Sequence, residues 1–131
     1  MLARKERWHR QFIPPFLLAQ VAHSPNKIIV GFKAKPRLHH IANTEPFALT
    51  SSDTGEDKKP RDIRLFARND NQGEWVEIYM QDGIKMPTGK NTEMTFNITS
   101  PGYYNSYRFE VGANWGNSFL DLNELTMNWA E

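Results

Sequence analysis

The segment 60–78 constrains the fold most, because it reads as two strands joined by a tight polar turn. In its first half, apolar and charged residues alternate, which places the apolar side chains on one face of a strand. Residues 69–73, Asn-Asp-Asn-Gln-Gly, are of types that tolerate positive φ and form turns. A second alternating run begins at Trp75. The segment therefore predicts a β-hairpin, with Ile63, Leu65 and Ala67 on its buried face.

Other alternating segments predict short strands at 27–34, 47–50, 92–99, 104–111 and 119–129. The final segment changes phase: Leu120 and Leu122 share one face, whereas Leu125, Met127 and Trp129 fall on the other. We expect a bulge near Asn123–Glu124 to restore a single buried face. Many short strands separated by turn residues are typical of an all-β sandwich.

Five segments, taken in order, carry a resemblance to a known family. Residues 49–53 (Leu-Thr-Ser-Ser-Asp) and 59–63 (Lys-Pro-Arg-Asp-Ile) precede the turn 69–75 (Asn-Asp-Asn-Gln-Gly-Glu-Trp). Residues 104–111 (Tyr-Asn-Ser-Tyr-Arg-Phe-Glu-Val) and 120–125 (Leu-Asp-Leu-Asn-Glu-Leu) follow. This order resembles the signature of the galactose-binding-like domains, the discoidin and coagulation-factor C-type sandwiches. The resemblance implies a galactose-binding-like jelly-roll β-sandwich over residues 26–131, with an extended N-terminal arm over residues 1–25.

The resemblance also implies where a ligand would bind. Family members place carbohydrate sites on loops at one end of the sandwich, where an aromatic ring stacks on a sugar and polar groups bind its hydroxyls. The candidate ligand-binding residues are Tyr103, Tyr104, Asn114 and Trp115. The segment that often carries calcium in the family has no counterpart before Ile28, so the resemblance predicts no metal and no cofactor.

Three further residues are predicted to be structural. Trp75 matches a core tryptophan of the family, so we expect it in the core. Arg108 and Glu124 lie in strands whose neighbours are apolar. A buried charge needs a partner, so we expect both to pair or to bind backbone groups, and truncation of either to cost a few kcal/mol.

Composition adds a charge asymmetry. Up to His40 the chain has eight Lys/Arg and one Glu, whereas the remainder has eight Lys/Arg and fourteen Asp/Glu. A basic arm on a mildly acidic domain fits this pattern. There is no cysteine, which excludes disulfides and thiol chemistry. We expect no secretory signal or membrane span, because Pro14–Pro15 interrupts the apolar run 12–22. The expected lack of a secretory signal favours a virion or the cytoplasm as the location.

The apolar character of the arm leaves three interpretations open. The arm packs on its own sandwich, docks into another protein subunit, or is an Arg-rich targeting segment. We favour docking, because a sandwich of this size rarely needs so long an apolar extension. The candidate docking residues are Arg4, Arg7, Trp8, Phe12, Ile13, Phe16 and Leu17.

Catalytic patterns are missing from the sequence: there is no nucleophile elbow, phosphate loop or HExxH motif. The adjacent pair His39–His40 would chelate a metal poorly, because neighbouring side chains of a strand point to opposite faces. We therefore expect a non-catalytic binding and structural module of a larger assembly, such as a phage tail or baseplate component, whose loops face a glycan or a neighbouring subunit. The alternatives are a free carbohydrate-binding lectin and a nucleic-acid-associated protein that uses its basic arm.

Overall fold

The computed structural model describes residues 9–13, 28–34, 42–51, 55–69, 72–89, 91–117 and 120–129. Within these ranges the chain is almost entirely β-structure, with one short 3-10 turn, η3 (Glu56–Lys58). No helix in the described ranges has the length and apolar character that a membrane crossing requires. The strands are β1 (His9–Ile13), β2 (Ile28–Lys33), β3 (Phe47–Thr50), β4 (Pro60–Asn69), β5 (Gln72–Gln81), β6 (Glu93–Phe96), β7 (Ser106–Asn114) and β8 (Glu124–Trp129).

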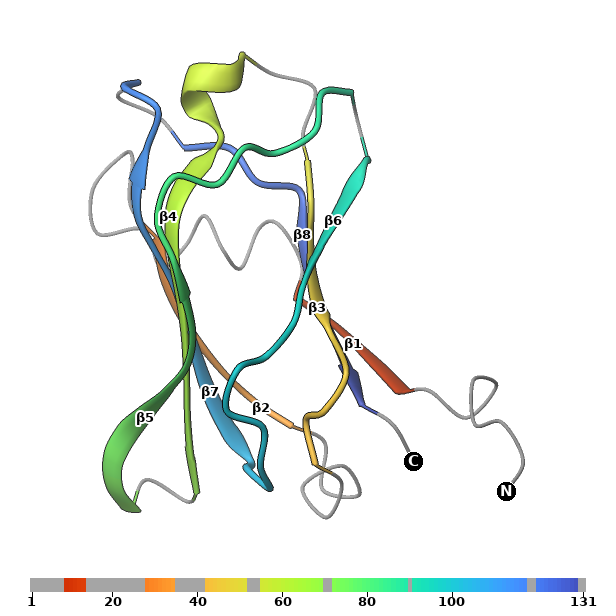
Figure 1. Cartoon of the computed structure of the whole chain (residues 1–131), viewed down its shortest axis with the longest axis vertical. Helices are drawn as coiled ribbons and strands as arrows, with labels where there is room; N and C mark the ends of the chain where they lie inside the picture. Colours follow the sequence, from red (N-terminus) through yellow and green to blue (C-terminus); the bar gives the residue numbers. More distant parts are fainter. Residues whose placement is uncertain are drawn as a thin grey trace.

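The strands form two four-stranded sheets that face each other, in the orders β1-β8-β3-β6 and β2-β7-β4-β5 (Figure 1). All strand pairs are antiparallel. Several neighbours within a sheet are far apart in sequence, as in a sandwich with crossover connections rather than a simple meander. The predicted all-β sandwich is confirmed.

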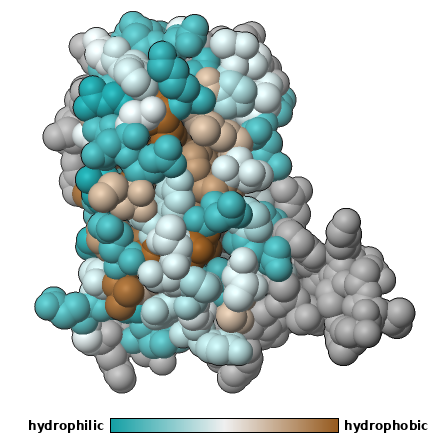
Figure 2. Space-filling view, in the orientation of Figure 1, coloured by the Kyte–Doolittle hydropathy of each residue, from teal (hydrophilic) through white to brown (hydrophobic). Residues whose placement is uncertain are grey.

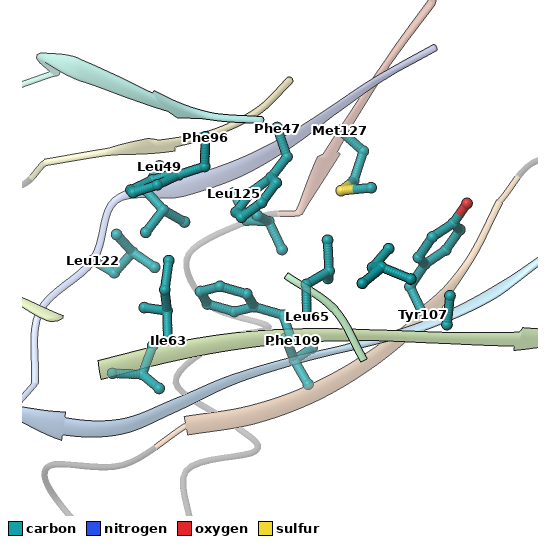
Figure 3. Packing of buried hydrophobic residues seen from close by; sticks show 14 of the residues in the cluster. Phe47, Leu49, Ile63, Leu65, Phe96, Tyr107, Phe109, Leu122, Leu125 and Met127 are labelled. Atoms are coloured by element: carbon teal, nitrogen blue, oxygen red, sulfur yellow. The ribbon is translucent and has the colours of Figure 1, made fainter. Parts of the chain in front are cut away.

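The core lies between the two sheets and follows the predicted alternation. Ile63, Leu65 and Ala67 on β4 are fully buried, as are Tyr107 and Phe109 on β7. Figure 3 shows apolar side chains of the two sheets pointing toward one another. From the facing sheet and the segment before β8 come Phe47, Leu49, Phe96, Leu122, Leu125 and Met127. This burial of apolar surface between the layers is the main stabilising contribution to the fold.

The hairpin β4–β5 is present, but its second strand is not regular. Leu65 is opposite Tyr79 and Phe66 is opposite Glu77, so Ile78 is an extra residue in β5. Such a bulge reverses the side-chain phase of the strand beyond it. Tyr79 therefore packs against the core, whereas Trp75 lies on the outer face of the sheet and is only half-buried. The prediction that Trp75 is a core residue is wrong for this reason.

Arg108 also lies on the outer face, although its neighbours along β7 are buried. Its side chain is 32% exposed and its Nε lies 2.9 Å from a carboxylate oxygen of Glu110. The expected partner therefore exists, but at the surface rather than in the core. The loss of stability expected on truncation of Arg108 stays a prediction.

The phase change near the C-terminus occurs without a bulge in the strand. Strand β8 begins at Glu124, and residues 120–123 before it are irregular. The N–H of Asn123 donates to the carbonyl of Thr50 over 3.0 Å, which holds this irregular segment beside β3. Leu122 and Leu125 can then both be buried. Glu124 is half-buried opposite Thr50, and the described part of the chain contains no ion pair for it.

Part of the predicted arm belongs to the sandwich. Strand β1 pairs with β8 from His9↔Trp129 to Ile13↔Leu125 and forms one edge of its sheet. The backbone of Phe12 and Ile13 is therefore hydrogen-bonded within this chain, as the first of the three interpretations of the arm requires. The other docking candidates, namely Arg4, Arg7, Trp8, Phe16 and Leu17, lie outside the described residues.

Candidate functional site

Trp115 lies directly after β7, at the end of the sandwich that also carries η3, at the top of Figure 1. Its side chain is 38% exposed. Its indole Nε1 donates to the carbonyl of Ile84 over 2.9 Å, and its backbone N–H donates to the carbonyl of Asp57 over 3.1 Å. These two hydrogen bonds hold the ring in a fixed orientation while leaving part of it open to solvent.

The ring forms one wall of an open pocket of about 220 Å³. The pocket is lined by Glu56, Asp57, Lys59, Lys85, Met86 and Trp115. Acidic groups come from the turn η3, and Lys85 and Met86 come from the connection after β5. The pocket therefore combines an aromatic surface with hydrogen-bond donors and acceptors, which is the combination found in small-molecule sites.

Two cations lie near the indole. The ammonium of Lys85 is 5.0 Å from the ring centroid, and the guanidinium carbon of Arg61 is 5.9 Å from it. Both distances are within the range of cation–π attraction. Arg61 also donates twice to Asp62, over 3.1 and 2.9 Å. This bidentate hydrogen bond is the main cause that lowers the pKa of Asp62 and raises the pKa of Arg61.

Asp62 connects the strand to the loop that orients the indole. Its Oδ1 accepts from the backbone N–H of Gly83 over 3.0 Å. Gly83 has φ of 71°, a conformation that favours glycine. The next N–H, that of Ile84, donates to the carbonyl of Arg61 over 2.8 Å. The carbonyl of Ile84 is thereby placed to receive the Nε1 proton of Trp115.

Replacement of Asp62 by Asn is expected to lower the free energy of unfolding by about 1 kcal/mol at neutral pH, because the hydrogen bonds to a charged group are lost. The lowered pKa of Asp62 means that this contribution is complete above the unfolded-chain value of about 4 and is lost as the pH falls through the native value. Urea unfolding at pH 7 and pH 3 measures the effect, and the difference between Asp62→Asn and the parent should shrink at pH 3.

Asp82→Asn is the matched control, because Asp82 is 60% exposed and pairs with Arg64 over 3.2 Å at the surface. A loss of at most about 1 kcal/mol is expected for this variant. An Asp62→Asn effect of equal size at both pH values would contradict the role given to the carboxylate.

The structure separates the four residues predicted to bind a ligand. Asn114 and Trp115 lie at the end of β7, whereas Tyr103 and Tyr104 precede its start, near the turn of the hairpin β4–β5. A strand of this length separates its two ends by roughly 30 Å. Tyr103 is 63% exposed, and its carbonyl accepts from Asn69 over 3.0 Å. Tyr104 packs against the core. The four candidate residues therefore do not lie in one site.

Asn114 organises the loop rather than facing the pocket. It is 3% exposed, and its Oδ1 accepts from the N–H groups of Gly116 and Asn117 over 3.1 and 3.2 Å. Its Nδ2 donates to the carbonyl of Asn117 over 3.0 Å. Asn117 in turn donates to the Asp57 carboxylate over 3.0 Å. Asn114 therefore acts on the site by positioning the loop beside Trp115.

Sequence reasoning missed six residues at this site, namely Glu56, Asp57, Lys59, Lys85 and Met86, which line the pocket, and Arg61, which lies near the ring. They come from three separate segments that only the fold places around Trp115. The acidic pair in an otherwise polar loop carried no distinguishing pattern. Among the described residues, no group of three His, Cys, Asp or Glu side chains is suited to a metal ion. His39 and His40 lie outside the described residues.

Comparison with known proteins rests on structure. No protein-family model matches the sequence, and no curated protein matches it. The F5/8 type C domain of a Bacteroides fragilis protein aligns with a TM-score of 0.61 and 10% identity, over 98% of this chain and 95% of that chain. The family 32 carbohydrate-binding module of NanJ from C. perfringens, in complex with galactose, aligns with a TM-score of 0.51 and 13% identity, over 95% and 96%. The chain therefore has the galactose-binding-like β-sandwich fold, as its hairpin and terminal strands predicted.

Proposed function

We propose that this chain is a non-catalytic carbohydrate-binding domain and that the pocket beside Trp115 holds the sugar. The observation that carries the proposal is the half-exposed indole, held by its hydrogen bond to Ile84 in the wall of a polar pocket. An aromatic ring fixed before binding loses little conformational freedom when a ligand stacks on it.

The pocket offers the two kinds of contact that a sugar needs. The C–H face of a pyranose is apolar and stacks on an indole, whereas its hydroxyls both donate and accept hydrogen bonds. Glu56 and Asp57 supply acceptors and Lys85 supplies donors around the ring. A pocket of about 220 Å³ is smaller than the sites of drug-sized ligands, which occupy about 300–1,000 Å³. The ligand expected here is therefore a single sugar unit, such as the end of a glycan.

The structural neighbours support this choice of ligand class. The family 32 module of NanJ was solved with galactose, and it shares the fold of this chain along nearly its whole length. At 13% identity the likeness extends to the fold, so the transfer of sugar binding to this chain is part of the proposal.

Calorimetric titration with galactose and N-acetylgalactosamine tests the proposal. Trp115→Ala is expected to weaken binding by about tenfold or more, since one lost stacking contact worth about 1.4 kcal/mol has that effect. Tyr103→Ala is the matched control, because Tyr103 is a more exposed aromatic residue at the opposite end of the sandwich. A loss of binding in Tyr103→Ala, with Trp115→Ala unchanged, would place the sugar at the other end and overturn the assignment.

The role in a larger assembly, including a phage tail or baseplate, stays a prediction. Its docking residues lie largely outside the described part of the chain, and no described contact favours it. The nucleic-acid role of the basic arm stays a prediction for the same reason.

A further inference from the structure

A second pocket lies on the outer face of the sheet β2-β7-β4-β5, beside the start of β7 and thus far from Trp115. Its volume is about 250 Å³. The lining residues are Gly31, Phe32, Lys33, Trp75, Ser106 and Tyr107. Phe32 and Tyr107 stack with their ring centroids 5.5 Å apart, which fixes the register of β2 and β7 beneath the pocket. A ligand in this pocket would have no contact with Trp115.

The wall of the pocket is a tryptophan held by two cations. The guanidinium carbon of Arg68 is 4.3 Å from the Trp75 ring centroid, and that of Arg108 is 5.0 Å from it. Arg108 also lies 4.7 Å from the Phe66 ring centroid. The β5 bulge that turns Trp75 outward therefore builds an ordered row of rings and guanidinium groups across the sheet.

Gly31 lines the pocket. In the described structure, neither the backbone conformation nor the packing at this position requires a glycine. Its φ is not among the positive values, and a Cβ added there would approach only the carbonyl oxygen of Tyr107, at 3.8 Å. Glycine inside a strand costs about 0.5–1 kcal/mol relative to alanine. In a strand, glycine often marks the close approach of a ligand. At Gly31 the missing side chain leaves the pocket open.

The charges around the pocket indicate which ligand fits. Lys33 lines it, and Arg68 and Arg108 lie against its tryptophan wall. Arg108 is paired with Glu110 over 2.9 Å, and Arg68 also donates to the carbonyl of Gly73 over 3.3 Å. Positive charge beside an aromatic wall suits a compact ring compound that carries a negative charge.

We propose that this outer-face pocket is a second binding site, which takes a sugar unit bearing a carboxylate, a hexuronic acid. The choice of a sugar, among ring compounds that carry an acid, rests on the proposed carbohydrate-binding function. The position and the charge of the pocket are observed independently of that function. One chain would then bind a neutral sugar at the Trp115 end and an acidic sugar on the outer face. A polysaccharide containing both kinds of unit would meet both sites.

Titration with methyl β-D-glucuronide, using methyl β-D-glucoside as the neutral counterpart, tests the proposal. The parent chain should bind the glucuronide at least about tenfold more tightly, and the difference should shrink as salt is added. Gly31→Val should abolish glucuronide binding by filling the pocket. Gly112→Val is the matched control, because Gly112 is a strand glycine with no atom within 4 Å of an added Cβ and lies outside the pocket.

A second variant covers the case in which Gly31→Val impairs folding. Lys33→Gln keeps the shape of the pocket and should lower the affinity for the glucuronide while leaving galactose binding unchanged. The Trp115→Ala variant separates the two proposals when both ligands are titrated into it. If this variant no longer binds galactose but still binds the glucuronide, the chain has two sites. Loss of both ligands in Trp115→Ala would overturn the second site and leave the first. Equal binding of glucuronide and glucoside by the parent would also overturn it.

Discussion

Trp129→Ala is expected to lower the free energy of unfolding by about 3–5 kcal/mol, the range for removal of a large aromatic from a packed core. Trp129 is fully buried in β8, with its ring centroid 6.1 Å from that of Tyr107 in an edge-on arrangement. The truncated side chain would leave a cavity between the sheets. Urea unfolding followed by circular dichroism measures the loss without relying on tryptophan fluorescence.

Trp75→Ala is the control for that experiment and removes the same side chain from the outer face. The loss should be about 1–2 kcal/mol, since each cation–π contact contributes about 0.5–1 kcal/mol at an exposed site. A Trp75→Ala variant as unstable as Trp129→Ala would mean that Trp75 is a core residue after all. The pair of variants thus decides between the family resemblance and the observed bulge.

Asn43→Ala is expected to lower the free energy of unfolding by about 2–4 kcal/mol, because each buried polar group left without a partner costs about 1–3 kcal/mol. The Asn43 side chain is fully buried, and its Oδ1 accepts from the N–H of Gly102 over 2.7 Å. Its Nδ2 donates to the hydroxyl of Tyr107 over 3.2 Å. Its backbone N–H also donates to the carbonyl of Gly102 over 3.0 Å. This asparagine joins the segment before β3 to the loop before β7.

Asn69→Ala provides the matched comparison, since Asn69 bridges the same loop from an exposed position. Its Nδ2 donates to the carbonyl of Tyr103 over 3.0 Å, and its Oδ1 accepts from the N–H of Asn105 over 2.9 Å. Water can replace these partners, so a loss of at most about 1 kcal/mol is expected. Chemical denaturation of both variants under the same conditions checks the difference, and equal losses would show that burial does not decide the cost at Asn43.

The surface in the view of Figure 2 is hydrophilic over most of its area, with apolar residues gathered along the line where the two sheets meet. The edge strand β5 has one carbonyl, that of Ile78, that accepts from both the N–H and the hydroxyl of Thr99, over 2.9 and 2.8 Å. Ser100 donates its N–H to the same carbonyl over 3.3 Å. At this position of β5 the carbonyl is therefore less available for pairing with another chain.

The sequence by itself determined most of the strands from Ile28 onward and the buried face wherever a strand is regular. Alternation alone assigned Ile63, Leu65 and Ala67 to the interior, and all three are buried. This is possible because the side chains of a regular strand alternate strictly, so a local pattern fixes which face is buried. The order of the hairpin, the segment 104–111 and the segment 120–125 then predicted the fold through the family resemblance.

Only the tertiary structure decided which side chains are buried beyond a bulge in a strand. It also decided which residues come together at each site. A single extra residue at Ile78 moved Trp75 from the core to the outer face, and nothing in the local pattern of β5 marks that position. The pocket at Trp115 gathers side chains from η3 and from the connection after β5, and Arg61 of β4 lies near the ring. The length of β7 kept Tyr103 away from the same pocket. Bulges and sites depend on which distant strands meet and in which register, and that register is set by packing between sheets rather than by neighbouring residues.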